Sequence, residues 1–186
     1  MKFALGILIL FSTFGPACAQ NSILKNVLSD ANVEVEYQKE CGSPVAESQT
    51  FDRRSGRVVE IRGAAAIVFE ESPDDKNSPP EKYVVRPAGI DVGKNEAEIR
   101  SFLVKNVLGR NVVIIGNTAK NEDREFFGII ETQDIKFPDV NRFLFEKGMA
   151  VFSEPAYFYS VSRYTLCVYR QLEARAKADK LGIWAK

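Results

Sequence analysis

The sequence of 186 residues contains no histidine. Histidine is the side chain that most often serves as a general base near neutral pH, and it is the commonest metal ligand. Its absence excludes the Ser-His and Cys-His nucleophilic mechanisms. It also removes the usual nitrogen ligand of zinc sites.

The chain also lacks net charge, since 25 basic residues balance 25 acidic ones. Affinity for nucleic acid comes mainly from lysines and arginines that neutralise phosphates, and domains that bind it are usually basic. A near-neutral chain must therefore concentrate its positive charge locally or bind nucleic acid weakly.

Long apolar runs are absent after the N-terminus, so no later segment is predicted to span a bilayer. Residues 3–14 form an apolar run of a dozen residues that follows Lys2, and small residues follow at Ala17 and Ala19. This pattern predicts a secretory signal peptide over residues 1–19, with cleavage near Ala19. The mature protein is then expected to be secreted or periplasmic and free of the membrane. Lipoprotein processing at Cys18 is the less favoured alternative.

Cysteine is scarce, with three residues in the chain. Removal of the signal peptide takes away Cys18 and leaves Cys41 and Cys167. An even pair in an exported protein predicts a disulfide bond. A metal or catalytic use is disfavoured because no histidine accompanies the pair.

The composition that remains is ordinary for a globular protein, with 45% hydrophobic and 27% charged residues. This length supports one domain with its own core. We expect a domain over residues 56–186, preceded by an N-terminal extension over residues 20–55 that Cys41 ties to it. The extension carries no recognisable chemistry.

Strand patterns begin at Gly56. The runs at 57–62 and 64–69 are predicted to form one long strand bent at Gly63. Further strands are predicted over residues 81–90, 111–115, 126–130 and 149–152.

Three helices are predicted between these strands, over residues 94–108, 139–148 and about 164–181. The first has Ile99 and Leu103 on one apolar face, and Asp139 is the expected N-cap of the second. Along the chain, the predicted order of elements is strands, helix, strands, helix, strand and helix. This order favours an α+β fold, mainly β, in which helices pack on a small closed barrel.

Several short motifs between residue 56 and residue 184 resemble those of the staphylococcal nuclease (thermonuclease-like) family. The motifs are Arg86 to Asp91, Val140-Asn141 with Leu144, Gly148 and Ala150, Glu173 with Ala176-Lys177, and Lys180-Leu-Gly-Ile-Trp184. The resemblance implies an OB-type five-stranded barrel with three helices.

That family cuts phosphodiester bonds of DNA and RNA with one calcium ion. Carboxylates hold the cation, a glutamate handles the attacking water, and two arginines neutralise the charge that grows on the phosphate. By resemblance, Arg86 matches the first of these arginines and Asp91 matches a metal carboxylate.

Other catalytic positions of the family are altered in this chain. Lys94 stands where the resemblance places the catalytic glutamate, and Ala64 belongs to a turn that has lost both carboxylates. Glu125 occupies the position of the second arginine. Glu96 replaces the glutamate only if the loop makes a detour, and Arg124 replaces the arginine only if a bulge shifts the strand.

The aromatic residues that the family uses for base stacking are also displaced. The matching positions hold Glu154 and Ala156, and aromatic residues follow at 157–159. These aromatic side chains are expected to cover the barrel. The alternative is that they form a platform on which bases stack.

A cluster of arginines at Arg53, Arg54, Arg57 and Arg62 is the densest basic feature and a candidate phosphate-binding face. A solvated charged surface is the commoner explanation of such a cluster. Arg86 is likewise expected to pair with Asp91 or Glu60, and Asp91 to cap the turn or helix that follows it.

We therefore expect an exported thermonuclease-like domain that has lost calcium-dependent cleavage and acts as a binding module. Weak affinity for nucleic acid or another polyanion would come from Arg86 and the arginine cluster, and no cofactor is expected. The alternative is a divergent metal-dependent nuclease for DNA or RNA that recruits Glu96 and Arg124. Calcium would be required only in that case.

Overall fold

A computed structural model describes residues 37, 39–43, 51–73, 78–116, 125–134, 136–153 and 161–185. The predicted signal peptide lies outside these residues, as does most of the predicted extension. Within the described ranges, none of the helices has the length and apolar character needed to cross a bilayer.

Five strands form a closed barrel in the order β1-β2-β3-β6-β5. The five are β1 (Asp52–Arg62), β2 (Ala66–Glu71), β3 (Lys82–Pro87), β5 (Asn111–Gly116) and β6 (Glu125–Thr132). The β3–β6 pair is parallel and the other pairs are antiparallel. Two short strands, β4 (Ile90–Asp91) and β7 (Val151–Phe152), pair beside the barrel. The predicted five-stranded barrel is confirmed.

The first two strands are a hairpin, so the prediction of one long bent strand is wrong. Arg62 pairs with Ala66, and the three residues between them make the turn. Gly63 has φ +60° there, a conformation that glycine adopts without steric cost. An alternating pattern with one central glycine does not distinguish a bulge from a tight turn, and here the pairing of β1 with β2 decides it.

β1 also begins four residues before the predicted start of the domain. Residues 52–55 pair with residues 113–116 of β5. These residues are mostly exposed and polar, so they show no apolar alternation. Their strand conformation comes from hydrogen bonding to β5 and not from local hydrophobic patterning.

The three predicted helices are present with slightly shorter bounds. They are α2 (Glu96–Asn106), α3 (Val140–Glu146) and α4 (Arg163–Ala178), and a 3-10 turn, η2 (Gly182–Trp184), follows. Ile99 and Leu103 of α2 are fully buried, as predicted. The helix stops before Gly109, whose φ of +75° lets its backbone N–H turn back to Val58 O.

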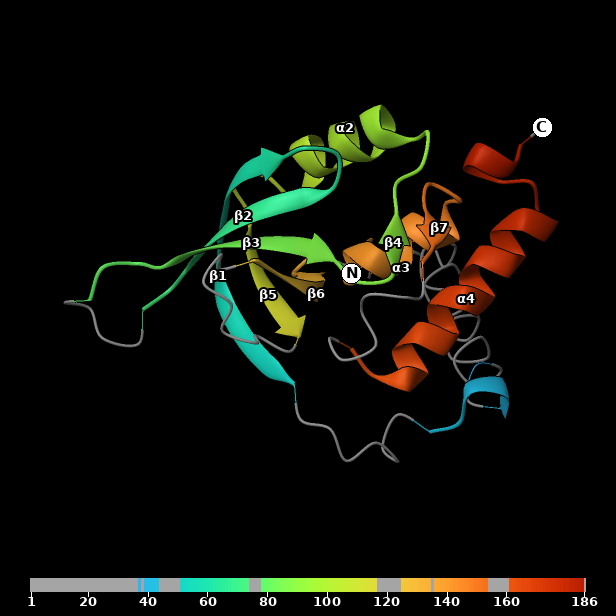
Figure 1. Ribbon diagram of the computed structural model, residues 1–186, viewed down its shortest axis with the longest axis horizontal. Coiled ribbons are helices and arrows are strands. Elements are labelled where there is room, and N and C mark those ends of the chain that lie inside the picture. The colour runs from blue at the N-terminus through green and yellow to red at the C-terminus, as the bar shows by residue number, and fades with distance from the viewer. Residues whose placement is uncertain are drawn as a thin grey trace, which may run out of the picture.

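The helices cover the barrel from two directions (Figure 1). α2 lies across one end of the barrel, while α3 sits between the barrel and α4. The interior is filled by apolar side chains from all five strands: Val58, Ile67, Phe69, Val85, Ile114, Phe126 and Ile130. The barrel is therefore a packed core and not a channel.

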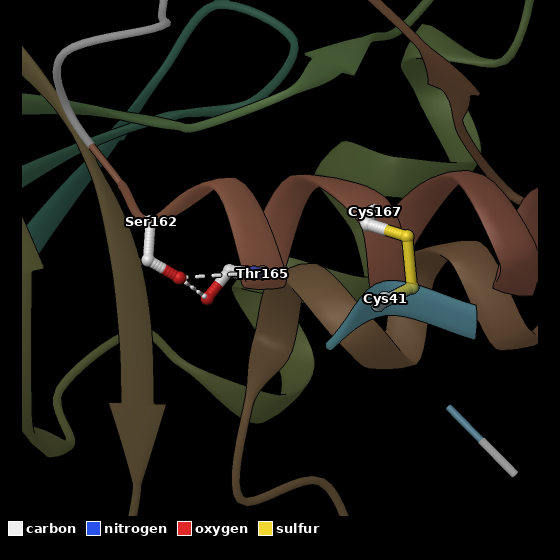
Figure 2. The surroundings of a disulfide bond; sticks show 4 residues. All are labelled: Cys41, Ser162, Thr165 and Cys167. Atoms are coloured by element: carbon white, nitrogen blue, oxygen red, sulfur yellow. Dashed lines mark hydrogen bonds between the residues drawn. A yellow bond between two sulfur atoms is a disulfide. The ribbon is translucent and has the colours of Figure 1, made fainter. Parts of the chain in front are cut away.

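Cys41 and Cys167 form a disulfide bond, as the sequence predicts. Figure 2 shows the bond joining the short helical stretch around Cys41 to α4, which begins at its N-cap Ser162. Nearby, Tyr37 is buried, and the Arg142 guanidinium lies 5.6 Å from its ring centroid. The described part of the extension is thus fixed to α3 and α4 by a covalent link and by an aromatic contact.

Asp139 is the N-cap of α3, as predicted, and it lies in an unusual environment. Its Oδ1 accepts a hydrogen bond from Arg142 N at 2.9 Å, and its Oδ2 accepts one from the buried Tyr169 hydroxyl at 3.0 Å. Burial raises the pKa of this carboxyl from its usual 3.8 to about 6. Removing the charged form from water costs more free energy than the two hydrogen bonds to the carboxylate regain.

This raised pKa predicts a stability that depends on pH. The folded state binds the proton more tightly than the unfolded chain, so Asp139 favours folding below its usual pKa of 3.8, and this contribution is lost as the pH rises through about 6. The two-unit difference corresponds to about 3 kcal/mol. Urea unfolding of the wild type and of Asp139→Asn is measured across this pH range. As the pH rises, the free energy of unfolding of the wild type should fall by about this much relative to that of the variant. Parallel pH profiles for the two proteins would contradict the assignment.

Candidate functional site

Arg86 lies near the end of β3, directly beside the start of β6. In the parallel pairing of these strands Val84 is opposite Glu125, which puts the Arg86 and Glu125 side chains on the same face. The Arg86 Nε donates a hydrogen bond to Glu125 Oε1, and the two form an ion pair. The predicted pairing of Arg86 with Asp91 or Glu60 is therefore wrong. Residues 39 positions apart meet only because β3 and β6 are neighbours in the closed barrel.

This ion pair changes what the Arg86 site offers to a phosphate. Glu125 stands where the resemblance to the nuclease family places a second arginine. A carboxylate there takes up a donor of Arg86 and opposes the positive potential that an incoming phosphate requires. The pair is partly exposed to solvent, with 52% of the Arg86 side chain accessible, so the stabilisation it gives the fold is small.

Asp91 ends β4, opposite Val151 of β7. Its Oδ1 accepts a hydrogen bond from Gly93 N at 2.9 Å, which closes an Asx turn before α2. Asp91 therefore caps the turn that follows it, as predicted. Gly93 has φ +50°, so the turn is also set by its glycine.

Glu96 is the first residue of α2, beyond the Asp91 turn. Its charge there is favoured by the positive end of the helix dipole, together with that of Glu98. Asn95, just before it, is fixed by a hydrogen bond from its Nδ2 to Met149 O at 2.9 Å. The start of the helix is thus held in place, and Glu96 belongs to a regular first turn.

The β1–β2 turn holds no carboxylate, since it reads Gly63, Ala64 and Ala65. The Arg100 guanidinium of α2 donates hydrogen bonds to Ile61 O and Gly63 O, both at 2.9 Å. This turn is therefore anchored to α2 by an arginine, in a place where the family resemblance implies a metal ligand.

Calcium does not fit the residues that the structure places here. The ion prefers six to eight oxygen ligands, and Asp91 is the one carboxylate that the sequence assigned to it. In the part of the chain that the structure describes, no three His, Cys, Asp or Glu side chains gather in a way that would hold a metal ion. The described residues thus lack the cluster that a calcium site needs.

The four arginines of the β1 cluster do not form one open face. Arg53 pairs with Glu131 at 2.8 Å and Arg54 with Glu71 at 2.7 Å, while Arg62 lies 3.4 Å from Glu60. Adjacent residues of a strand point to opposite faces, which separates Arg53 from Arg54. The Arg57 Nε donates to a backbone carbonyl, Gly109 O, at 3.1 Å.

Arg57 lines a groove that was not predicted from the sequence. The groove has a volume of about 780 Å³ and is lined by Arg57, Asn106, Gly109, Arg110, Asn111, Thr132, Gln133, Asp134 and Lys136. Arg110 and Lys136 had no distinguishing motif. The signal that could have found them is their place in the loops at the start of β5 and after β6, which are antiparallel neighbours.

Two predicted features lie outside the described residues. Arg124, the replacement considered for the second arginine, precedes the first described residue of β6. The aromatic residues 157–159, with Glu154 and Ala156, are also outside the described ranges.

A closed mixed barrel of five strands with helices packed on it defines an OB-type α+β domain. Residues 80–186 match the family model of the staphylococcal nuclease homologues, and this range is more than half of the chain. The chain belongs to the staphylococcal nuclease family. Its first hairpin, β1 and β2, precedes the matched range and completes the same barrel. A comparison with curated proteins gave no match.

Proposed function

We propose that this chain is an exported staphylococcal nuclease homologue that does not cut phosphodiester bonds and acts as a binding module for polyanions. The Arg86–Glu125 ion pair is the observation that supports the loss of cleavage. Catalysis of phosphoryl transfer needs donors aimed at the charge that grows on the phosphate. Here the arginine at that place is already bonded to a carboxylate of the protein itself.

The surrounding residues support the loss of cleavage. Asp91 closes a turn, and Lys94 follows where a glutamate would handle the attacking water. The turn at Gly63 carries no carboxylate. Among the described residues at the family's metal and base positions, Asp91 is therefore the one carboxylate, which is too few for the metal chemistry of the family.

Export is proposed from the N-terminal pattern and is consistent with the disulfide. Disulfide bonds persist in oxidising compartments and are rare in the cytosol, and Cys41 is joined to Cys167. Expression with the native N-terminus should release a protein whose intact mass lacks residues 1–19. Retention of these residues in the released protein would contradict the signal-peptide assignment.

A cleavage assay tests the proposed loss of activity. The mature chain, from Gln20 onwards, is incubated with single-stranded DNA and with RNA, in calcium and in chelator, with an active calcium nuclease as the positive control. Both substrates are expected to stay intact even when protein and substrate are equimolar. Calcium-dependent cleavage that disappears in Arg86→Ala would overturn the proposal, because a contaminating nuclease would not respond to that substitution.

A further inference from the structure

The groove that Arg57 lines lies far from the Arg86–Glu125 pair. β6 begins at Glu125 and ends at Thr132, which lines the groove. The seven residue-to-residue steps between them span about 23 Å. Arg57 of β1 is paired with Asn111 of β5, and β5 pairs in turn with β6. The groove is therefore built where three neighbouring strands of the barrel meet the end of α2.

The charged side chains of the groove are three cations, Arg57, Arg110 and Lys136, and one carboxylate, Asp134. In the described ranges none of these cations lies within 4.0 Å of a carboxylate oxygen, the limit for a salt bridge. Elsewhere on the barrel the cations are paired: Arg53, Arg54, Arg62, Lys82 and Arg86 each have a glutamate partner. Among the described cations on and beside the barrel strands, those without a carboxylate partner thus lie together at this groove.

The loop after β6, which carries Lys136, is held in shape by hydrogen bonds between its own residues. Thr132 Oγ1 accepts from Asp134 N at 3.2 Å and donates to Phe137 O at 2.8 Å, and Asp134 Oδ1 accepts from Lys136 N at 2.9 Å. Asp134 is therefore engaged in holding the loop after β6. On the other wall, the Arg57 Nε donates to Gly109 O, and no hydrogen bond joins its two Nη groups to another described residue.

Compensation of the α2 dipole explains only part of this arrangement. Cations at the C-terminus of a helix are stabilising, and the bond from Arg57 to Gly109 O is of this kind. Arg110 and Lys136 make no such side-chain bond among the described residues. Their exposed side chains flank a concave surface whose other walls carry the polar Asn111 and Gln133 side chains.

We propose that this groove binds phosphate-bearing anions. Arginine guanidinium groups match the geometry of phosphate oxygens, and lysine adds a compact charge. The amides of Asn111 and Gln133 supply further donors. This inference rests on the proposed function and places the polyanion site away from Arg86, at Arg57, Arg110 and Lys136. The phosphate belongs either to a single-stranded nucleic acid or to a small phosphate compound.

The number of cations limits the affinity for nucleic acid. A single strand that gives up about 0.7 counterion for each of three neutralised phosphates loses affinity with a log–log salt slope of about −2. Binding should then weaken about twentyfold between about 50 and 200 mM salt. With two cations removed, the slope should fall to about −0.7.

The test uses the mature chain with its disulfide intact. The groove variant is Arg110→Gln/Lys136→Gln, and the matched control is Lys39→Gln/Lys82→Gln, which removes the same charge at two exposed positions outside the groove. Fluorescence anisotropy in chelator measures binding to labelled single-stranded oligothymidine over the salt series, and calorimetry measures binding of inorganic pyrophosphate. Urea unfolding checks that both variants are folded.

The groove variant is expected to bind oligothymidine at least tenfold more weakly at low salt, with the shallower slope, while the control keeps both properties. Pyrophosphate should compete with the oligonucleotide in the wild type. If pyrophosphate alone binds and the groove variant abolishes this, the site stands with a small phosphate compound as its ligand, and the polyanion function falls. If the wild type binds oligothymidine and the groove variant binds equally well, the groove inference is overturned and the polyanion function stands. If the wild type binds neither probe, both are overturned.

Discussion

Replacing Cys41 and Cys167 together by alanine is expected to lower the free energy of unfolding by about 4 to 5 kcal/mol. The two residues are 126 positions apart, so their bond closes a loop that covers most of the described chain. On the chain-entropy model, a cross-link over so long a loop removes a large part of the freedom of the unfolded state. Folded domains are stable by about 5 to 15 kcal/mol, so this loss would bring the protein close to unfolding.

Urea unfolding of the double variant, and of the wild type in reductant, provides the measurement. Ser162→Ala on the same helix is the control and shows the size of an ordinary local loss. It removes the N-cap hydrogen bond that Thr165 N donates to Ser162 Oγ at 3.0 Å (Figure 2). That loss should be about 1 kcal/mol. A double cysteine variant that loses no more than Ser162→Ala would show that the cross-link contributes little to stability.

Asn141→Leu is expected to lower the free energy of unfolding by about 4 kcal/mol, although the two side chains are similar in size. Asn141 is fully buried on α3. Its Oδ1 accepts from Ile130 N at 3.2 Å, and its Nδ2 donates to Ala88 O and Gly128 O, both at 3.1 Å.

The cost arises from the partners that leucine leaves behind. Gly128 O keeps a hydrogen bond from Ala88 N at 2.9 Å, but Ile130 N and Ala88 O lose their contacts with Asn141. Each buried group left without a partner costs roughly 1 to 3 kcal/mol.

The same substitution at Asn106 is the matched control. Its Nδ2 donates to Phe102 O one turn earlier in α2, and the residue is half-buried. Asn106→Leu should change the stability by no more than about 0.5 kcal/mol. Equal losses at the two positions would contradict a structural role for Asn141 in joining α3 to β6.

The sequence predicted the elements well wherever local patterning was strong. Ile99 and Leu103 marked the buried face of α2, and Asp139 marked the start of α3. It failed at the β1–β2 hairpin, because Gly63 suits a bulge and a turn equally well. It also missed the start of β1 at Asp52, where the strand is polar and owes its conformation to β5.

The candidate site was harder to predict than the fold. The sequence showed that Ala64, Lys94 and Glu125 depart from the nuclease pattern, which is a matter of residue identity alone. It did not show that Glu125 would pair with Arg86, since that contact depends on the parallel register of β3 and β6. The groove at Arg57 was not predicted either, because its walls come from three strands and a helix end that are distant in sequence.

By itself, then, the sequence determined the types of side chain present, the absence of histidine, and the local periodicity that builds each helix and most strands. These are properties of single residues and of neighbours along the chain. Tertiary structure alone decided which charges meet. It neutralised Arg86 with Glu125 and left Arg110 and Lys136 together in a groove. The physical reason is that electrostatic interactions depend on distance in space, and the closure of the barrel sets those distances.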